Sequence, residues 1–189
     1  MTKLSIRPIV AGISILFASA TPLHAEQQNH RQHGAHEHGS ARLMLAIEGN
    51  ELEMELISPA MNLVGFEHQP ANPQQRKAVY QAIDTLKAAD RLFILPKPAT
   101  CTLQKVEVET GLAADGHGHG HDENRQGKAS HAEFHAHYHF RCNNIAELKQ
   151  IDVQLFSHFP ATHELDVEMI TGSGQKAVEL NHDHHKLTL

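Results

Sequence analysis

Four histidines and one glutamate recur at every second position of one short segment: His131, Glu133, His135, His137 and His139. We call these five residues the histidine stripe. Neutral imidazole nitrogens and carboxylate oxygens are the ligands that Zn²⁺ binds when thiolates are absent. Cu²⁺ and Ni²⁺ bind the same donors, so the pattern indicates a divalent, borderline metal more firmly than zinc itself. We expect the stripe to form a defined, tight metal site.

The alternation predicts that the stripe lies on one face of a β-strand that ends at Cys142. Successive side chains of a strand point to opposite faces. The intervening residues therefore face the core: Ala132, Phe134, Ala136, Tyr138 and Phe140. Neighbouring positions on one face lie about 7 Å apart, from which two imidazoles can converge on one cation. A helix would scatter the same residues around its circumference.

The chain has 18 histidines, and most of the others lie in segments without apolar periodicity. A glycine-rich stretch carries His117, His119 and His121, and a polar arm near the N-terminus carries His36 and His38. Ordering such a segment costs about 1 to 2 kcal/mol per residue, so the loop histidines are expected to form weak accessory sites. His36, His38 and His68 are candidates to complete the stripe. Lone His158 and His163 are expected to be ordinary surface residues.

Residues 1–25 predict a secretory signal peptide, with Lys3 and Arg7 followed by an apolar run and then small residues. Cleavage after Ala20 and cleavage after Ala25 both fit. The apolar run is too short to span a bilayer, and no later segment predicts membrane insertion. We therefore expect a periplasmic protein. A net charge of −6 argues against nucleic acid as a partner.

The sequence predicts one β-rich domain at 40–189, preceded by a flexible arm at 26–39 and interrupted by a flexible loop at 111–130. Expected strands cover residues 42–48, 51–56, 92–95, 101–110, 131–142, 151–156, 165–170 and 176–180. A helix begins after Asn72, with Pro73 at its first position. The fold class is therefore mainly β with one packed helix (α+β), arranged as antiparallel, sandwich-like sheets.

The two cysteines lie at the outer ends of the two strands that the loop joins. Cys101 opens the strand before the loop, and Cys142 closes the strand after it. Export makes a disulfide their default state. An antiparallel pairing would bring them together, but Val106 and Val108 then reach the core only through a bulge or a register shift. Acidic residues also alternate with apolar residues at 51–55 and 164–168, a pattern typical of solvated strand faces.

Several segments together resemble the ZrgA-like family of periplasmic zinc-binding proteins. They are Ala35–Gly39 before the first strand, Ser58-Pro59-Ala60, Val64–His68, the helix at Asn72-Pro73, and Cys101 with the His-rich loop and Phe134–Cys142. The resemblance implies a zinc-responsive role beside a TonB/ExbB/ExbD-type complex or an outer-membrane receptor. It also implies that His36, His38, His68 and the stripe histidines are ligands, with the loop histidines as accessories.

The predicted function is that of a periplasmic protein that captures or buffers Zn²⁺ for uptake, and not of an enzyme. A Cu²⁺ or Ni²⁺ tolerance sponge, or a metallochaperone for these ions, is the alternative. More remotely, His36-Glu37-His38-Gly39 resembles part of the metal motif of copper–zinc superoxide dismutases. The stripe does not match H-E-x-x-H, because the order is wrong and the segment predicts a strand.

Overall fold

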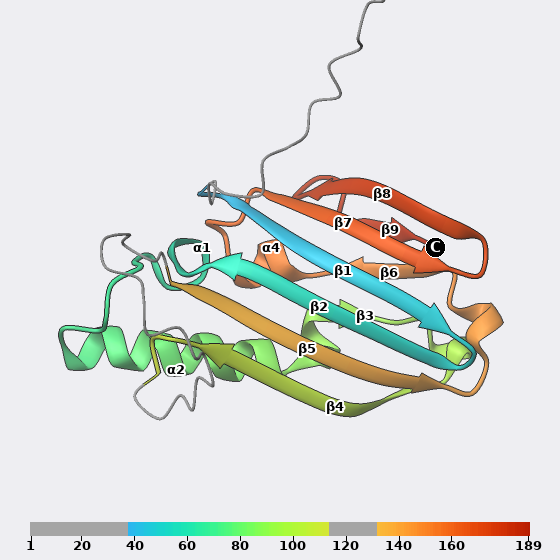
Figure 1. Ribbon diagram of the computed structural model, residues 1–189, viewed down its shortest axis with the longest axis horizontal. Coiled ribbons are helices and arrows are strands. Elements are labelled where there is room, and N and C mark those ends of the chain that lie inside the picture. The colour runs from blue at the N-terminus through green and yellow to red at the C-terminus, as the bar shows by residue number, and fades with distance from the viewer. Residues whose placement is uncertain (1–37, 114–131) are drawn as a thin grey trace, which may run out of the picture. The chain divides into compact units, whose positions relative to one another are not determined.

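The computed structural model describes residues 38–113 and 132–189 (Figure 1). The predicted signal peptide, the arm up to residue 37 and the loop from residue 114 to 131 lie outside the described residues. So do five of the predicted ligands: His36, His117, His119, His121 and His131.

Six strands form the larger sheet, in the order β4-β5-β2-β1-β7-β8. Their bounds are β1 Ser40–Glu48, β2 Glu51–Pro59, β4 Cys101–Thr110, β5 Glu133–Cys142, β7 Glu164–Thr171 and β8 Gly174–Asn181. A smaller sheet has the order β3-β6-β9, with β3 Phe93–Ile94, β6 Gln150–Val153 and β9 Lys186–Thr188. These sheets confirm the mainly β prediction. One pair departs from the antiparallel expectation, because β1 and β7 run parallel.

The expected helix is α2, Pro73–Lys87, and the Asn72 side chain accepts a hydrogen bond from the Gln75 backbone N–H at 2.9 Å. Shorter helices are α1 Ala60–Val64, α3 Ala89–Leu92 and α4 Leu155–His158, with 3-10 turns η1 Lys97–Ala99 and η2 Ile145–Glu147. The strand expected at 151–156 ends at Val153, where α4 follows. The consecutive residues Leu155 and Phe156 are both buried, which a helical turn allows and an alternating strand does not.

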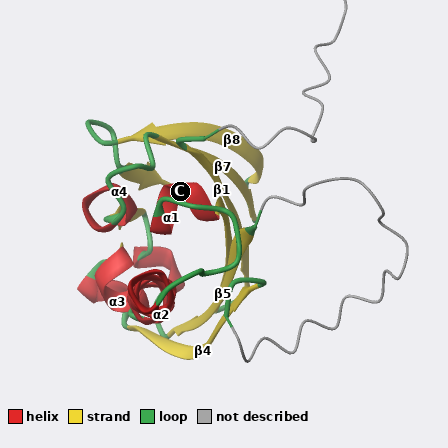
Figure 2. Cartoon of the chain, turned by 90° about the vertical axis from the view of Figure 1, so that its left-hand side faces the viewer, coloured by secondary structure: helices red, strands yellow, loops and turns green. Residues whose placement is uncertain are grey.

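The helices cover one side of the curved larger sheet, as Figure 2 shows for α2, α3 and α4. The smaller sheet packs on the same side, where the Phe93 ring meets the edge of the Tyr138 ring with centroids 5.1 Å apart. The Tyr138 hydroxyl donates to the Leu86 carbonyl at 3.0 Å, and burial raises the pKa of this phenol well above its usual value. This side of the sheet is the core, so the other face is left to solvent.

The β4–β5 pairing matches the cysteine argument. Cys101 lies opposite Cys142 and forms the disulfide with it. The register shifts between Leu103 and Lys105, and as a result Val106 and Val108 pack against the core. The expected bulge is therefore confirmed, and it lies at the disulfide end of the strand pair.

Candidate metal centre

Strand β5 presents the described part of the stripe on the solvent face of the larger sheet. Phe134, Ala136 and Tyr138 are each about 1% exposed, while the side chains of His135, His137 and His139 are 37%, 47% and 33% exposed. The alternation of burial follows the alternation of the sequence without interruption. The three imidazoles are thus held in a row on β5, which pairs with β4 on one side and with β2 on the other.

The β2 strand supplies carboxylates to the row. Glu55 lies directly opposite His137, and Glu53 lies opposite His139. The Oε1 atom of Glu55 is 3.5 Å from Nε2 of His137 and 3.6 Å from Nδ1 of the neighbouring His135. One carboxylate oxygen therefore lies against two imidazoles, and Glu133 lies 3.5 Å from the other ring nitrogen of His135.

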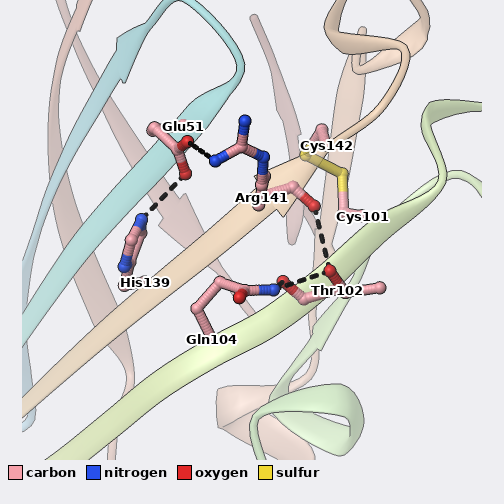
Figure 3. Close-up of a disulfide and its surroundings, with 7 residues drawn as sticks. All are labelled: Glu51, Cys101, Thr102, Gln104, His139, Arg141 and Cys142. Carbon is pink, nitrogen blue, oxygen red and sulfur yellow. Dashed lines mark hydrogen bonds and ion pairs between the residues drawn. A yellow bond between two sulfur atoms is a disulfide. The ribbon is translucent and has the colours of Figure 1, made fainter.

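His139 has carboxylate partners of its own. Its Nε2 atom is 2.8 Å from Oε2 of Glu51 and 3.5 Å from Oε1 of Glu53. The second oxygen of Glu51 is held by Arg141, whose Nη1 lies 3.1 Å away. Figure 3 shows Glu51 reaching from β2 between these two β5 side chains, next to the Cys101–Cys142 disulfide.

These separations suit a shared cation. Two ligand atoms on a tetrahedral zinc ion, each bound at 2.0 to 2.1 Å, are about 3.3 Å apart. The imidazole-to-carboxylate distances in the row, from 2.8 to 3.6 Å, lie on either side of that value. A cation between such a pair would bind a deprotonated ring nitrogen on one side and a carboxylate oxygen on the other. The side chains are partly exposed, so small rotations about their bonds can close the coordination shell.

The opposite flank of the row is different. On β4, Glu107 lies directly opposite His137 in register, but its carboxylate pairs with Lys105 at 2.8 Å. Glu109 lies opposite His135. The imidazoles thus contact carboxylates of β2 and Glu133 of β5 itself, whereas Glu107 on β4 is paired with Lys105.

The sequence patterns did not identify the β2 glutamates as partners. Their alternation with Leu52, Met54 and Leu56 was assigned to a solvated face, and they do lie on that face. The pattern did not indicate which strand lies beside β2, and the structure shows that β2 pairs with β5 over its whole length. The signal that could have found them is charge, because Glu51, Glu53 and Glu55 lie opposite Arg141, His139 and His137 and complement them across the two strands.

His38 and His68 have other partners. Nε2 of His38 lies 3.2 Å from Oε1 of Glu67, and Nδ1 of His68 lies 2.9 Å from the Gln69 carbonyl. The His68 ring stacks on Phe66 at a centroid distance of 5.2 Å. Within the described residues, therefore, both histidines make contacts outside the stripe.

Elsewhere on the solvent face, an acidic group spans β7 and β8. Among the described residues, only Glu164, Asp166 and Glu179 already bring three donor atoms within 4.8 Å of one another. Arg42 lies opposite Asp166 in register, which places a guanidinium beside these carboxylates. The group offers oxygen ligands alone and is separated from β5 by β2 and β1, so it does not belong to the stripe.

A hollow of about 580 Å³ lies beside the row on the same face. His137, Glu53 and Glu55 form one border, and Met44 and Ile170 are among its apolar lining residues. The row is therefore open to solvent on this side. No helix of the described segments is long and apolar enough to cross a membrane.

Comparison with known proteins adds one match. A family model described as ZrgA family zinc uptake protein matches residues 35–189, which include the strands β1, β2 and β5 and the disulfide. No curated protein matches the chain. The matched region covers every residue of the candidate centre.

Proposed function

The chain belongs to the ZrgA family of zinc uptake proteins, and from this premise we propose that its histidine stripe captures Zn²⁺ in the periplasm and holds it for uptake. The observation that carries the proposal is the contact of three strand-held imidazoles with the carboxylates of β2. The family concerns zinc uptake and is not one of known enzymes, so the stripe is assigned to binding rather than to catalysis.

The geometry supports capture followed by release. Nitrogen and carboxylate oxygen donors suit Zn²⁺, and the row is pre-ordered because β5 pairs on both sides and is joined to β4 by the disulfide. Pre-ordered ligands lower the conformational entropy that binding must offset. The side chains remain between a third and a half exposed, so an acceptor can reach the bound ion.

Residues outside the described part of the chain complete the proposal. The predicted signal peptide supports export to the periplasm, and the resemblance noted in the sequence supports an acceptor such as an outer-membrane receptor or a TonB/ExbB/ExbD-type complex. The histidines of the arm and the loop are proposed to collect Zn²⁺ weakly and to pass it to the stripe. His38 and His68, which the structure describes in contact with Glu67 and Gln69, are proposed as further ligands through the same resemblance.

The direct test replaces His135, His137 and His139 with Ala together and measures Zn²⁺ affinity by competition with a fluorescent chelator. We expect the tightest binding to disappear. The matched control removes three exposed imidazoles from elsewhere, at His158, His182 and His184, and should leave that affinity unchanged. Unaltered tight binding in the stripe variant would refute the proposal.

Copper and nickel are separated from zinc by the native metal content. Cu²⁺ binds imidazole sites at least as strongly as Zn²⁺ in vitro, so affinity alone does not identify the cargo. Protein isolated from its own periplasm without an affinity tag should contain zinc, and zinc starvation should raise its expression. Copper or nickel in the isolated protein, with induction by an excess of that metal, would instead support the tolerance function.

A further inference from the structure

We propose that the stripe provides two separate cation sites rather than one shared site. This inference rests on the proposed function and specifies how many ions the row holds. The first site is built around Glu55 and the second around His139. Their donors are His135, His137 and Glu55 for the first, and His139, Glu51 and Glu53 for the second.

The contacts of β2 divide the imidazoles into these two groups. Glu55 contacts His135 and His137, whereas Glu51 and Glu53 contact His139. None of these three carboxylates contacts imidazoles of both groups. A single ion serving all three histidines would have to sit near His137 and would draw His139 away from Glu51, its closest partner at 2.8 Å.

The spacing along the strand gives room for two ions. Positions two residues apart on one face of a strand lie roughly 7 Å apart, so His135 and His139 are separated by about twice that distance. This span exceeds what two imidazoles can close around one ion with bonds of 2.0 to 2.1 Å. His137 must therefore join one neighbour, and its contact with Glu55 joins it to His135.

The local charge also favours more than one cation. Four carboxylates, Glu51, Glu53, Glu55 and Glu133, lie along the row, and one guanidinium, Arg141, accompanies them. With neutral imidazoles these five groups carry four negative charges and one positive charge, a net charge of −3. One Zn²⁺ leaves −1, so a second dication still meets a negative row. Repulsion between the ions makes the second bind more weakly than the first.

The second site is the better fixed of the two groups. Arg141 holds one oxygen of Glu51 while the other faces His139, so this carboxylate is oriented before an ion arrives (Figure 3). The Cys101–Cys142 disulfide ties the same end of β5 to β4. The first site lies toward the start of β5, where the chain returns from the segment between residues 113 and 132.

The test counts tightly bound Zn²⁺ by native mass spectrometry in the mature, untagged protein, at a chelator concentration that strips weak sites. Relative to the parent, His139→Ala should lose one ion, His135→Ala with His137→Ala should lose one ion, and the triple variant should lose two. Glu51→Gln with Glu53→Gln keeps every imidazole and should weaken one ion at least about ten-fold while leaving the other unchanged. Glu107→Gln with Glu109→Gln is the matched control on β4 and should retain both ions.

Each other outcome is decisive. If all three histidine variants lose the same single ion, the stripe is one shared site; the two-site inference fails and the proposed function stands. If His139→Ala alone loses both ions, the sites are not separate and the inference also fails. If the triple variant loses none, the proposed function itself fails. Each variant should keep the fold, because all the replaced side chains lie on the solvent face. Circular dichroism and thermal melting check this.

Discussion

Glu55→Gln gives the sharpest single-residue test of the contact between the two strands. The substitution keeps the shape of the side chain and removes its negative charge, while the imidazoles of His135 and His137 stay in place. Its matched control is Glu107→Gln, because Glu55 and Glu107 both lie directly opposite His137, on β2 and β4 respectively. Only Glu55 contacts the ring, since Glu107 is paired with Lys105.

The magnitude follows from distance and exposure. Two unit charges 4 Å apart attract by about 1 kcal/mol in bulk water and by about 4 kcal/mol at an effective dielectric constant of 20. The Glu55 side chain is 30% exposed and lies 3.5 Å from the nearest ligand nitrogen, so its effect falls between these limits. Removing an outer-shell carboxylate costs 10- to 100-fold in affinity, or about 1.4 to 2.7 kcal/mol, and the Gln side chain keeps one oxygen donor at the position of Glu55, so the loss of its charge is of the same order. We expect a loss in this range for Glu55→Gln.

The assay is a competition titration against a fluorescent zinc chelator at pH 7.5 and about 0.15 M salt, where charges beyond about 8 Å are screened. Glu107→Gln should change the affinity less than three-fold. If Glu55→Gln leaves the affinity within two-fold of the parent, the contact does not contribute to binding. If both variants weaken binding equally, the effect comes from the general negative field of the face, and the argument from contact is wrong.

Three further outcomes test the scaffold and the ligands. Tyr138→Phe leaves the buried Leu86 carbonyl without its donor and should lower the free energy of unfolding in urea by about 1 to 3 kcal/mol, with Zn²⁺ affinity unchanged. Replacing both Cys101 and Cys142 with Ser removes the disulfide, which joins positions 41 residues apart, and should lower the free energy of unfolding by about 4 kcal/mol. An unchanged urea midpoint would contradict this. Zn²⁺ should dissociate as the pH falls toward 5, because imidazoles bind metal only when deprotonated, with a loss of up to about 100-fold per pH unit for two ligands. Affinity that stayed constant from pH 7.5 to 5 would exclude imidazole ligands.

The local parts of the structure were predictable from the sequence because their causes are local. A period of two fixes which β5 side chains face the core, whatever strand lies beside it. Asn72 caps the N-terminus of α2 and Pro73 occupies its first position, so both signals for the start of this helix are adjacent in the sequence. The cysteine pair then added one long-range constraint, and the need to bury valines on β4 predicted a bulge or a register shift, which the structure has between Leu103 and Lys105.

Long-range neighbours were the part that sequence patterns left open. The parallel pairing of β1 with β7 joins strands more than a hundred residues apart, and neither strand carries a mark of its partner. The short strand β9 was not predicted, because three residues are too few to show a periodicity. At α4, the alternation of Ile151, Val153 and Leu155 with polar residues predicted a strand, but the chain turns into a short helix at Leu155, where Leu155 and Phe156 are both buried.

The same distinction explains why the histidines were found and their carboxylate partners were not. Two strands offered alternating acidic residues, β2 at 51–55 and β7 at 164–168, and only the sheet order places β2 beside β5. Once that order is known, the face is no longer a free choice. Leu52, Met54 and Leu56 must face the core with Phe134, Ala136 and Tyr138, so the glutamates and the histidines must share the opposite face. A slip of one residue in this register would bury three carboxylates, which apolar burial forbids. The hydrophobic core thus aligns the candidate metal ligands, although none of the ligands belongs to it.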